Sequence, residues 1–122
     1  ATWWVPGAFE LPVAAVSAAQ RKPDAVIAVG CVLKGQTPQY TAIGQAVANA
    51  LAQVSVITGI PVTFGVIVAD STAQARARAG GRKGNRGREA ALAALATIGV
   101  LAKIRRGRSA HSPRTTVRGG NG

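Results

Sequence analysis

The sequence has 122 residues, a formal net charge of +11 and a hydrophobic fraction of 48%. This length suits one domain, and the apolar fraction supports a real hydrophobic core. A single cysteine, Cys31, excludes an internal disulfide framework, and no apolar run is long enough to span a bilayer. No signal-peptide pattern opens the sequence, so we expect a cytoplasmic protein. Scarce aromatics with abundant Ala, Val and Gly are typical of a parallel α/β sheet.

Hydrophobic periodicity and turn residues predict alternating strands and helices along the chain. The strand at 25–31 is an almost uninterrupted apolar run, which predicts burial on both faces, with Cys31 as a small buried hydrophobe. In chain order the sequence predicts a short strand at 2–5, a helix at 10–19, a strand at 25–31, a helix at 38–58 closed by Gly59, a strand at 61–68, a helix from about 72 to 79, a loop at 80–85 and a helix at 86–105.

The stretch from Gly30 to Tyr40 joins a buried strand to a helix that begins near Pro38. Unpaired N–H groups and the helix dipole make such a helix start a place for an anion, most often phosphate. Ligands on parallel sheets bind outside the carboxyl ends of the strands. We therefore expect the loops at 6–10, 34–39 and 69–72 to meet at one edge.

The positive charge is unevenly distributed. Acidic and basic residues balance up to Asp70, whereas the many later Arg and Lys residues face only Glu89. We expect an α/β domain at 1–105 and a basic, disordered tail at 106–122. The basic C-terminal region leaves a nucleic-acid partner as an alternative, although no binding motif or interleaved aromatic supports it.

Several separated motifs resemble the lumazine synthase (6,7-dimethyl-8-ribityllumazine synthase) family, in that family's order and spacing. The resemblance covers about residues 4–104. The motifs are Val5-Pro6-Gly7-Ala8-Phe9-Glu10-Leu11-Pro12, the run 24–30, Gly35-Gln36-Thr37-Pro38, the run 59–66, Arg78-Ala79-Gly80 and Gly84-Asn85-Arg86-Gly87.

The resemblance implies a three-layer α/β/α fold with a parallel sheet in flavodoxin-like order. It also implies an enzyme of riboflavin biosynthesis that condenses 5-amino-6-ribitylaminouracil with 3,4-dihydroxy-2-butanone 4-phosphate, losing phosphate and water. The family uses no cofactor or metal. It forms homo-oligomers, either pentamers or sixty-subunit shells, with sites at subunit interfaces and no membrane partner.

The same resemblance implies roles for individual residues. Gln39 stands where the family has its proton-transferring histidine, Arg86 where it usually has lysine, and Glu89 where a carboxylate orients that histidine. The substrate-binding residues would be Ala8, Phe9 and Glu10 for the ribityl chain, Cys31, Val32 and Leu33 for the pyrimidine, and Phe64 from the neighbouring subunit. The phosphate would be held by Gln36, Thr37 and Arg78.

Considered singly, these residues also have ordinary structural interpretations. Phe9 and Phe64 would be core residues, Arg78 a solvated side chain, and Asn85 a helix cap. Only their co-occurrence in family order favours the site.

Two features depart from the family pattern. An amide at Gln39 cannot exchange a proton near neutral pH, so we expect an impaired synthase or a non-catalytic, shell-forming paralogue. The only histidine, His111, lies in the tail. The family's first strand and helix, with the strand central in the sheet, are also missing. We expect a truncated or mis-started chain; alternatively, the flanking strands pair directly or another chain donates the strand.

Overall fold

A parallel pair of strands forms the centre of the molecule. The computed structural model describes residues 1–107. Almost all of the predicted tail, including His111, therefore lies outside the described residues. The elements are a 3-10 helix η1 (Ala8–Glu10), α1 (Leu11–Ala19), β1 (Val26–Leu33), α2 (Gln39–Thr58), β2 (Val62–Ala69), α3 (Thr72–Arg78), β3 (Ala79–Gly81), β4 (Gly84–Asn85) and α4 (Arg86–Arg105).

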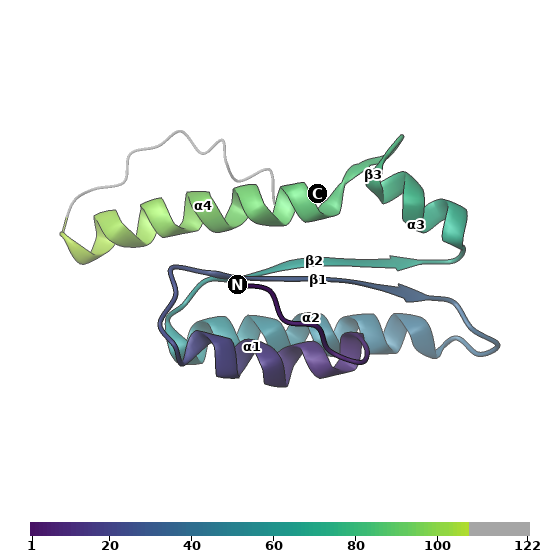
Figure 1. Cartoon of the computed structure of the whole chain (residues 1–122), viewed down its shortest axis with the longest axis horizontal. Helices are drawn as coiled ribbons and strands as arrows, with labels where there is room; N and C mark the ends of the chain where they lie inside the picture. Colours follow the sequence, from purple (N-terminus) through teal and green to yellow (C-terminus); the bar gives the residue numbers. More distant parts are fainter. Residues whose placement is uncertain (108–122) are drawn as a thin grey trace.

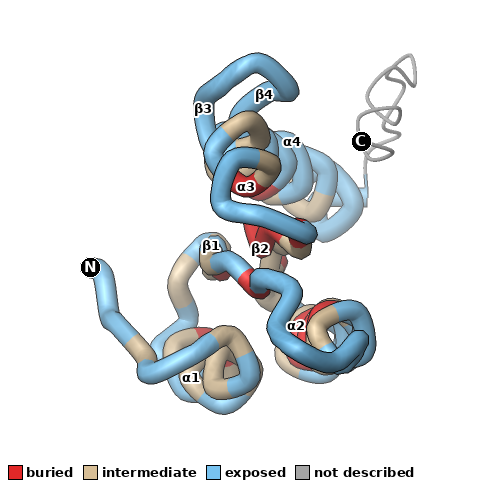
Figure 2. Tube along the Cα trace, turned by 90° about the vertical axis from the view of Figure 1, so that its right-hand side faces the viewer, coloured by how far each residue is buried: buried red, intermediate tan, exposed pale blue. Residues whose placement is uncertain are grey.

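Helices cover both faces of the sheet formed by β1 and β2. The two strands run parallel and in register, from Val26 opposite Val62 to Leu33 opposite Ala69. Helices α1 and α2 pack on one face, and α3 and α4 lie on the other (Figures 1 and 2). This arrangement confirms the prediction of an α/β/α fold with a parallel sheet.

Local signals set the helix boundaries. Helix α2 ends at Gly59, whose φ of 73° is readily adopted only by glycine among common residues. Ser71 accepts a hydrogen bond from the Gln74 backbone N–H at the start of α3, and Asn85 accepts one from the Arg88 N–H at the start of α4. These side chains satisfy N–H groups that the helices themselves leave unpaired.

Small residues allow the helices to approach the sheet closely. Val47 and Leu51 of α2 pack with Val66 of β2 in the most buried part of the core. Gly44 faces Val68 so closely that a Cβ atom there would lie 2.6 Å from Val68 Cγ2. Ala90 of α4 packs against Gly65 in the same way on the opposite face, where a Cβ atom on Gly65 would lie 3.2 Å from the Ala90 Cβ.

Three sequence predictions were wrong. Residues 2–5 form no strand, because no neighbouring strand pairs with them among residues 1–107. Strand β1 is buried on only one face: Ala28 and Val32 are buried, whereas Val29 and Cys31 on the other face are exposed. Cys31 is therefore a free, exposed cysteine, because α4 packs mainly over β2 and leaves this face of β1 uncovered. The predicted loop at 80–85 contains the short antiparallel pair β3–β4.

Replacing Gly44 with Ala should destabilise the fold, and the same change at Gly99 should not. The Gly44→Ala Cβ would clash with β-branched Val68, and overpacking costs about 1–3 kcal/mol, which exceeds the roughly 1 kcal/mol helix-propensity gain of Ala. Gly99 lies within α4 with no atom within 4 Å of a Cβ position, so Gly99→Ala should stabilise by about 0.5–1 kcal/mol. The free energy of unfolding of each variant, measured in urea, tests this prediction. Changes in the same direction for the two variants would contradict the packing described.

Candidate active site

The candidate site begins where β1 and β2 end side by side. The Lys34 N–H donates to the Ala69 carbonyl at 3.0 Å, so the parallel pairing continues one residue beyond β1. The segment 34–38 then leads into α2, and residues 70–71 lead into α3 (Figure 1). The loops at 34–39 and 69–72 therefore meet at one edge of the sheet, as expected for a parallel sheet.

Tyr40 joins these two loops. Its hydroxyl donates to Asp70 Oδ1 at 2.5 Å, and the Asp70 N–H donates to the Gln74 side-chain oxygen at 2.6 Å. The hydrogen bond from Tyr40 to Asp70 raises the pKa of Tyr40 above its ordinary value of 10.0, with smaller contributions from burial and from the negative charge of Asp70. Sequence analysis did not assign Tyr40 or Asp70 to the site, although a polar residue directly after a strand end, as Asp70 is after β2, is a detectable signal.

The first turn of α2 is open to solvent. Gln36, Thr37 and Gln39 are exposed, and Pro38 precedes the helix without a side-chain cap on its N–H groups. Thr41 Oγ1 donates to the Pro38 carbonyl at 3.1 Å, which braces the turn from within the helix. Because helix α2 has 20 residues, its amino end combines free N–H donors with a full helix dipole. This end is chemically suited to an anion.

The residues expected at the ribityl chain lie on η1, which contacts both β1 and α2. Phe9 is 65% exposed, which excludes the core role that an isolated phenylalanine would suggest. Glu10 folds back over Gly7, with its Oε1 3.1 Å from the position of a Gly7 Cβ. These residues are therefore available to a ligand on the α1–α2 side of the sheet.

The residues expected at the pyrimidine are split between the two faces of β1. Val32 is buried in the core, so only its backbone is left for a ligand. Cys31 and Leu33 line a hollow of about 500 Å³ on the opposite face, together with Arg76 and Asn85. Arg76, which sequence analysis did not identify, lines this hollow, whereas Arg78 is half-buried at the end of α3 and does not.

The remaining expected residues are Arg86 and Glu89 on α4 and Phe64 on β2. Arg86 Nε and Glu89 Oε1 are 3.4 Å apart within the first turn of α4, a partly exposed pair of the kind that contributes little to stability. Phe64 is near the start of β2, at the opposite end from the loops, and packs against the core. Within one subunit, Phe64 is not brought to the candidate site.

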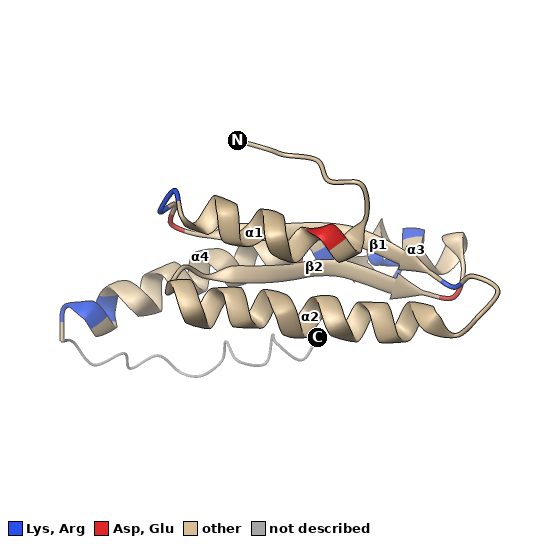
Figure 3. Ribbon diagram, turned by 90° about the horizontal axis from the view of Figure 1, so that it is seen from below, with Lys and Arg blue, Asp and Glu red and all other residues tan. Residues whose placement is uncertain are grey.

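Basic residues lie on α3, at the start of α4 and at its C-terminal end (Figure 3). A nucleic-acid partner for this region stays a prediction. Within residues 1–107 no group of three or more His, Cys, Asp or Glu side chains is placed to hold a metal ion. None of the helices in this part of the chain is long and apolar enough to cross a membrane.

The titration of Tyr40 provides a direct test of its bond to Asp70. Tyr40 is the single tyrosine of the chain, so phenolate absorbance reports it alone. We expect its midpoint above 10.0, moving down towards 10.0 in Asp70→Asn. Because the pKa of Tyr40 is raised in the folded state, the stabilisation from its bond to Asp70 is present below about pH 10. It is lost as the pH rises through the folded-state pKa of Tyr40. An unchanged midpoint in Asp70→Asn would contradict the bond.

Comparison with known proteins places this geometry in a family. The sequence profile of 6,7-dimethyl-8-ribityllumazine synthase matches residues 1–102. The chain is 41% identical over 103 residues to the 6,7-dimethyl-8-ribityllumazine synthase of Leuconostoc mesenteroides subsp. mesenteroides, covering 84% of this chain and 66% of the relative. It is 50% identical over 99 residues to that of Kineococcus radiotolerans, covering 80% of this chain and 62% of the relative. The chain thus spans just under two thirds of each relative, and it belongs to the 6,7-dimethyl-8-ribityllumazine synthase family.

Proposed function

We propose that this chain carries the substrate site of a lumazine synthase, at the carboxyl ends of β1 and β2. The reaction would condense 5-amino-6-ribitylaminouracil with 3,4-dihydroxy-2-butanone 4-phosphate in riboflavin biosynthesis. The observation that carries the proposal is the family match over residues 1–102, which includes each of the loops that surround this edge of the sheet. The hydrogen bond between Tyr40 and Asp70 also supports the proposal, because this bond holds two of those loops together.

The phosphate end of the ketone substrate would lie at the start of α2. The exposed Gln36 and Thr37 supply an amide and a hydroxyl there, beside the free N–H groups of the first helical turn. Arg78 would complete the phosphate site with a guanidinium, whose paired N–H groups match two phosphate oxygens. Arg76 is a further cation on the same helix, already at the hollow beside Cys31.

The pyrimidine would lie against the backbone of Cys31, Val32 and Leu33, and its ribityl chain would reach η1. There Glu10 would accept hydrogen bonds from ribityl hydroxyls, while Ala8 and the exposed ring of Phe9 would form an apolar wall. Such a site is complete only if Phe64 of a neighbouring subunit closes it. This favours a homo-oligomer, either a pentamer or a sixty-subunit shell.

Proton transfer is the weak step of this proposed reaction. Gln39, the first residue of α2, can position a water molecule or donate a hydrogen bond, but it cannot act as a general acid or base. Glu89, expected to orient a histidine, is instead within 3.4 Å of Arg86. Arg86 could still stabilise developing negative charge. The site therefore supports binding and orientation more than it supports proton transfer.

The amide at position 39 also favours a second candidate function. A family member whose position 39 is an amide could bind ligand and assemble without turnover, as a non-catalytic, shell-forming paralogue. Ligand binding with no lumazine formation would distinguish this paralogue from an impaired enzyme.

Restoring a titratable group at position 39 tests the proposed function. Gln39→His should raise the rate of lumazine formation, followed by absorbance, by about 10²–10⁴-fold, because this is the usual contribution of general acid–base catalysis. Gln45→His is a matched control, since Gln45 is also exposed on α2 but lies farther along the helix. If both variants had equal rates while the pyrimidine substrate still bound, the role given to position 39 would be wrong.

A further inference from the structure

A group of basic side chains lies where α3, the β3–β4 hairpin and α4 follow one another. Helix α3 ends at Arg78, and α4 begins at Arg86, with the hairpin between them. The cations of the segment 76–88 are Arg76, Arg78, Arg82, Lys83, Arg86 and Arg88. Four of them are exposed, and we call these four the basic hairpin surface: Arg76, Arg82, Lys83 and Arg88.

Backbone contacts hold the hairpin against the two helices. The Lys83 N–H donates to the Ala77 carbonyl at 2.7 Å, which folds the turn of the hairpin back onto the end of α3. A Cβ atom on Gly81 would lie only 2.8 Å from the Arg76 carbonyl oxygen, and β3 also contacts α4. The hairpin lies on the side of the molecule away from α1 and α2 (Figure 2). The basic side chains are therefore fixed on one compact unit.

Few negative charges balance the basic hairpin surface. Glu89 is the one acidic residue of the segment 71–107, and its Oε1 lies 3.4 Å from Arg86 Nε. Asp70, the preceding acidic residue, accepts the hydrogen bond from Tyr40. Among residues 1–107 no carboxylate lies within ion-pair distance of the four exposed cations. Because close like charges repel one another, a polyanion that neutralises them binds favourably.

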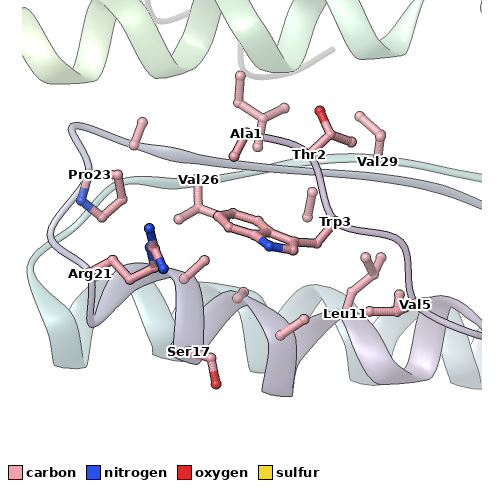
Figure 4. Close-up of a pocket in the computed structure, with 16 residues that line it drawn as sticks. Ala1, Thr2, Trp3, Val5, Leu11, Ser17, Arg21, Pro23, Val26 and Val29 are labelled. Atoms are coloured by element: carbon pink, nitrogen blue, oxygen red, sulfur yellow. The ribbon is translucent and has the colours of Figure 1, made fainter.

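The basic hairpin surface offers positive charge without a large apolar or aromatic side chain. Besides polar residues and glycines, the segment 76–88 contains only Ala77 and Ala79. Trp3, by contrast, lies beside α1, with its ring centroid 5.6 Å from Arg21 Cζ (Figure 4). The segment therefore has no ring to stack on a base, and no apolar anchor of the kind that protein interfaces and membrane-surface helices use. These properties favour phosphate groups as the partner.

We propose that the basic hairpin surface binds the phosphate backbone of a nucleic acid, without preference for base sequence. Three of its four cations are arginines, whose guanidinium groups match pairs of phosphate oxygens. A DNA duplex carries one negative charge for about every 1.7 Å of its axis, so several cations on one hairpin contact it at once. The inference rests on the charge and packing of the segment 76–88, and it goes beyond the proposed lumazine synthesis.

A salt-dependent titration tests the proposal. The 122-residue chain is titrated into a fluorescein-labelled DNA duplex of about 20 base pairs, long enough to present many phosphates, and binding is followed by fluorescence anisotropy. Two duplexes of unrelated sequence should bind within about twofold of each other, because phosphate contacts carry no sequence information. In the double variant Arg82→Gln/Lys83→Gln, binding should weaken equally for both duplexes, and the slope of log K against log salt should become shallower by about 2.

Two controls separate binding at the hairpin from attraction to the net charge. Lys103 and Arg106 are also exposed, but they lie at the C-terminal end of α4. Lys103→Gln/Arg106→Gln removes the same charge as Arg82→Gln/Lys83→Gln, and it should leave the affinity within about twofold and the salt slope unchanged. Polyglutamate, which carries carboxylates in place of phosphates, should compete about tenfold more weakly per charge than unlabelled duplex, because it lacks the paired oxygens of a phosphate backbone.

Three outcomes would overturn the proposal. The first is no binding of the duplex, and the second is an equal effect of the two double variants, which would assign binding to charge outside the hairpin. The third is equal competition by polyglutamate, which would indicate an acidic protein as the partner. Arg82 and Lys83 have no part in the proposed substrate site, so their double variant should still bind the pyrimidine substrate normally. Nucleic-acid binding and lumazine synthesis can therefore fail independently of each other.

Discussion

The in-register parallel pairing of β1 with β2 is the constraint on which the rest of this structure depends. It aligns Leu33 with Ala69, so the two chain segments that follow leave the sheet at the same edge. The hydrogen bond from Lys34 to Ala69 extends the ladder by one residue, and the Tyr40–Asp70 bond then fixes the start of α2 against the end of β2. A slip of one residue in this pairing would turn the side chains of one strand to the opposite face and separate these partners.

Helices pack closely on both faces of the two-stranded sheet at the centre of the described residues. Gly44 allows α2 to approach Val68, and Gly65 allows α4 to approach the opposite face through Ala90. Both contacts are on β2, which explains why the side chains of β2 are better buried than those of β1. The small side chains that the composition already shows are therefore a requirement of the geometry, because larger ones would separate the layers.

The sequence predicted what is encoded locally and missed what depends on distant partners. The bounds of α4 and the caps at Gly59 and Asn85 follow from neighbouring residues, and the structure agrees with them. Residues 2–5 and the burial of Cys31 depend on neighbours that the described chain does not supply, so their β-propensity and apolar pattern misled the prediction. The alternation of strands and helices correctly placed two of the three expected loops, 34–39 and 69–72, together at one edge of the sheet. It could not reveal that Arg76 lines the hollow beside Cys31, because that depends on how α3 packs.

The open edge of β1 and the candidate site share residues and secondary-structure elements. This edge pairs with no strand among residues 1–107, and an apolar groove lies beside it. Val29 lines both the groove on one side of β1 and the hollow that contains Cys31 on the other. Helix α1 likewise contributes Leu11 to the groove and continues directly from η1, which carries Phe9 and Glu10. An edge strand paired on one side only is easier to distort than a central strand, and a substrate site works only if its groups keep their positions. The packing of η1 and α1 against β1 therefore holds the walls of the candidate site in place without touching a substrate.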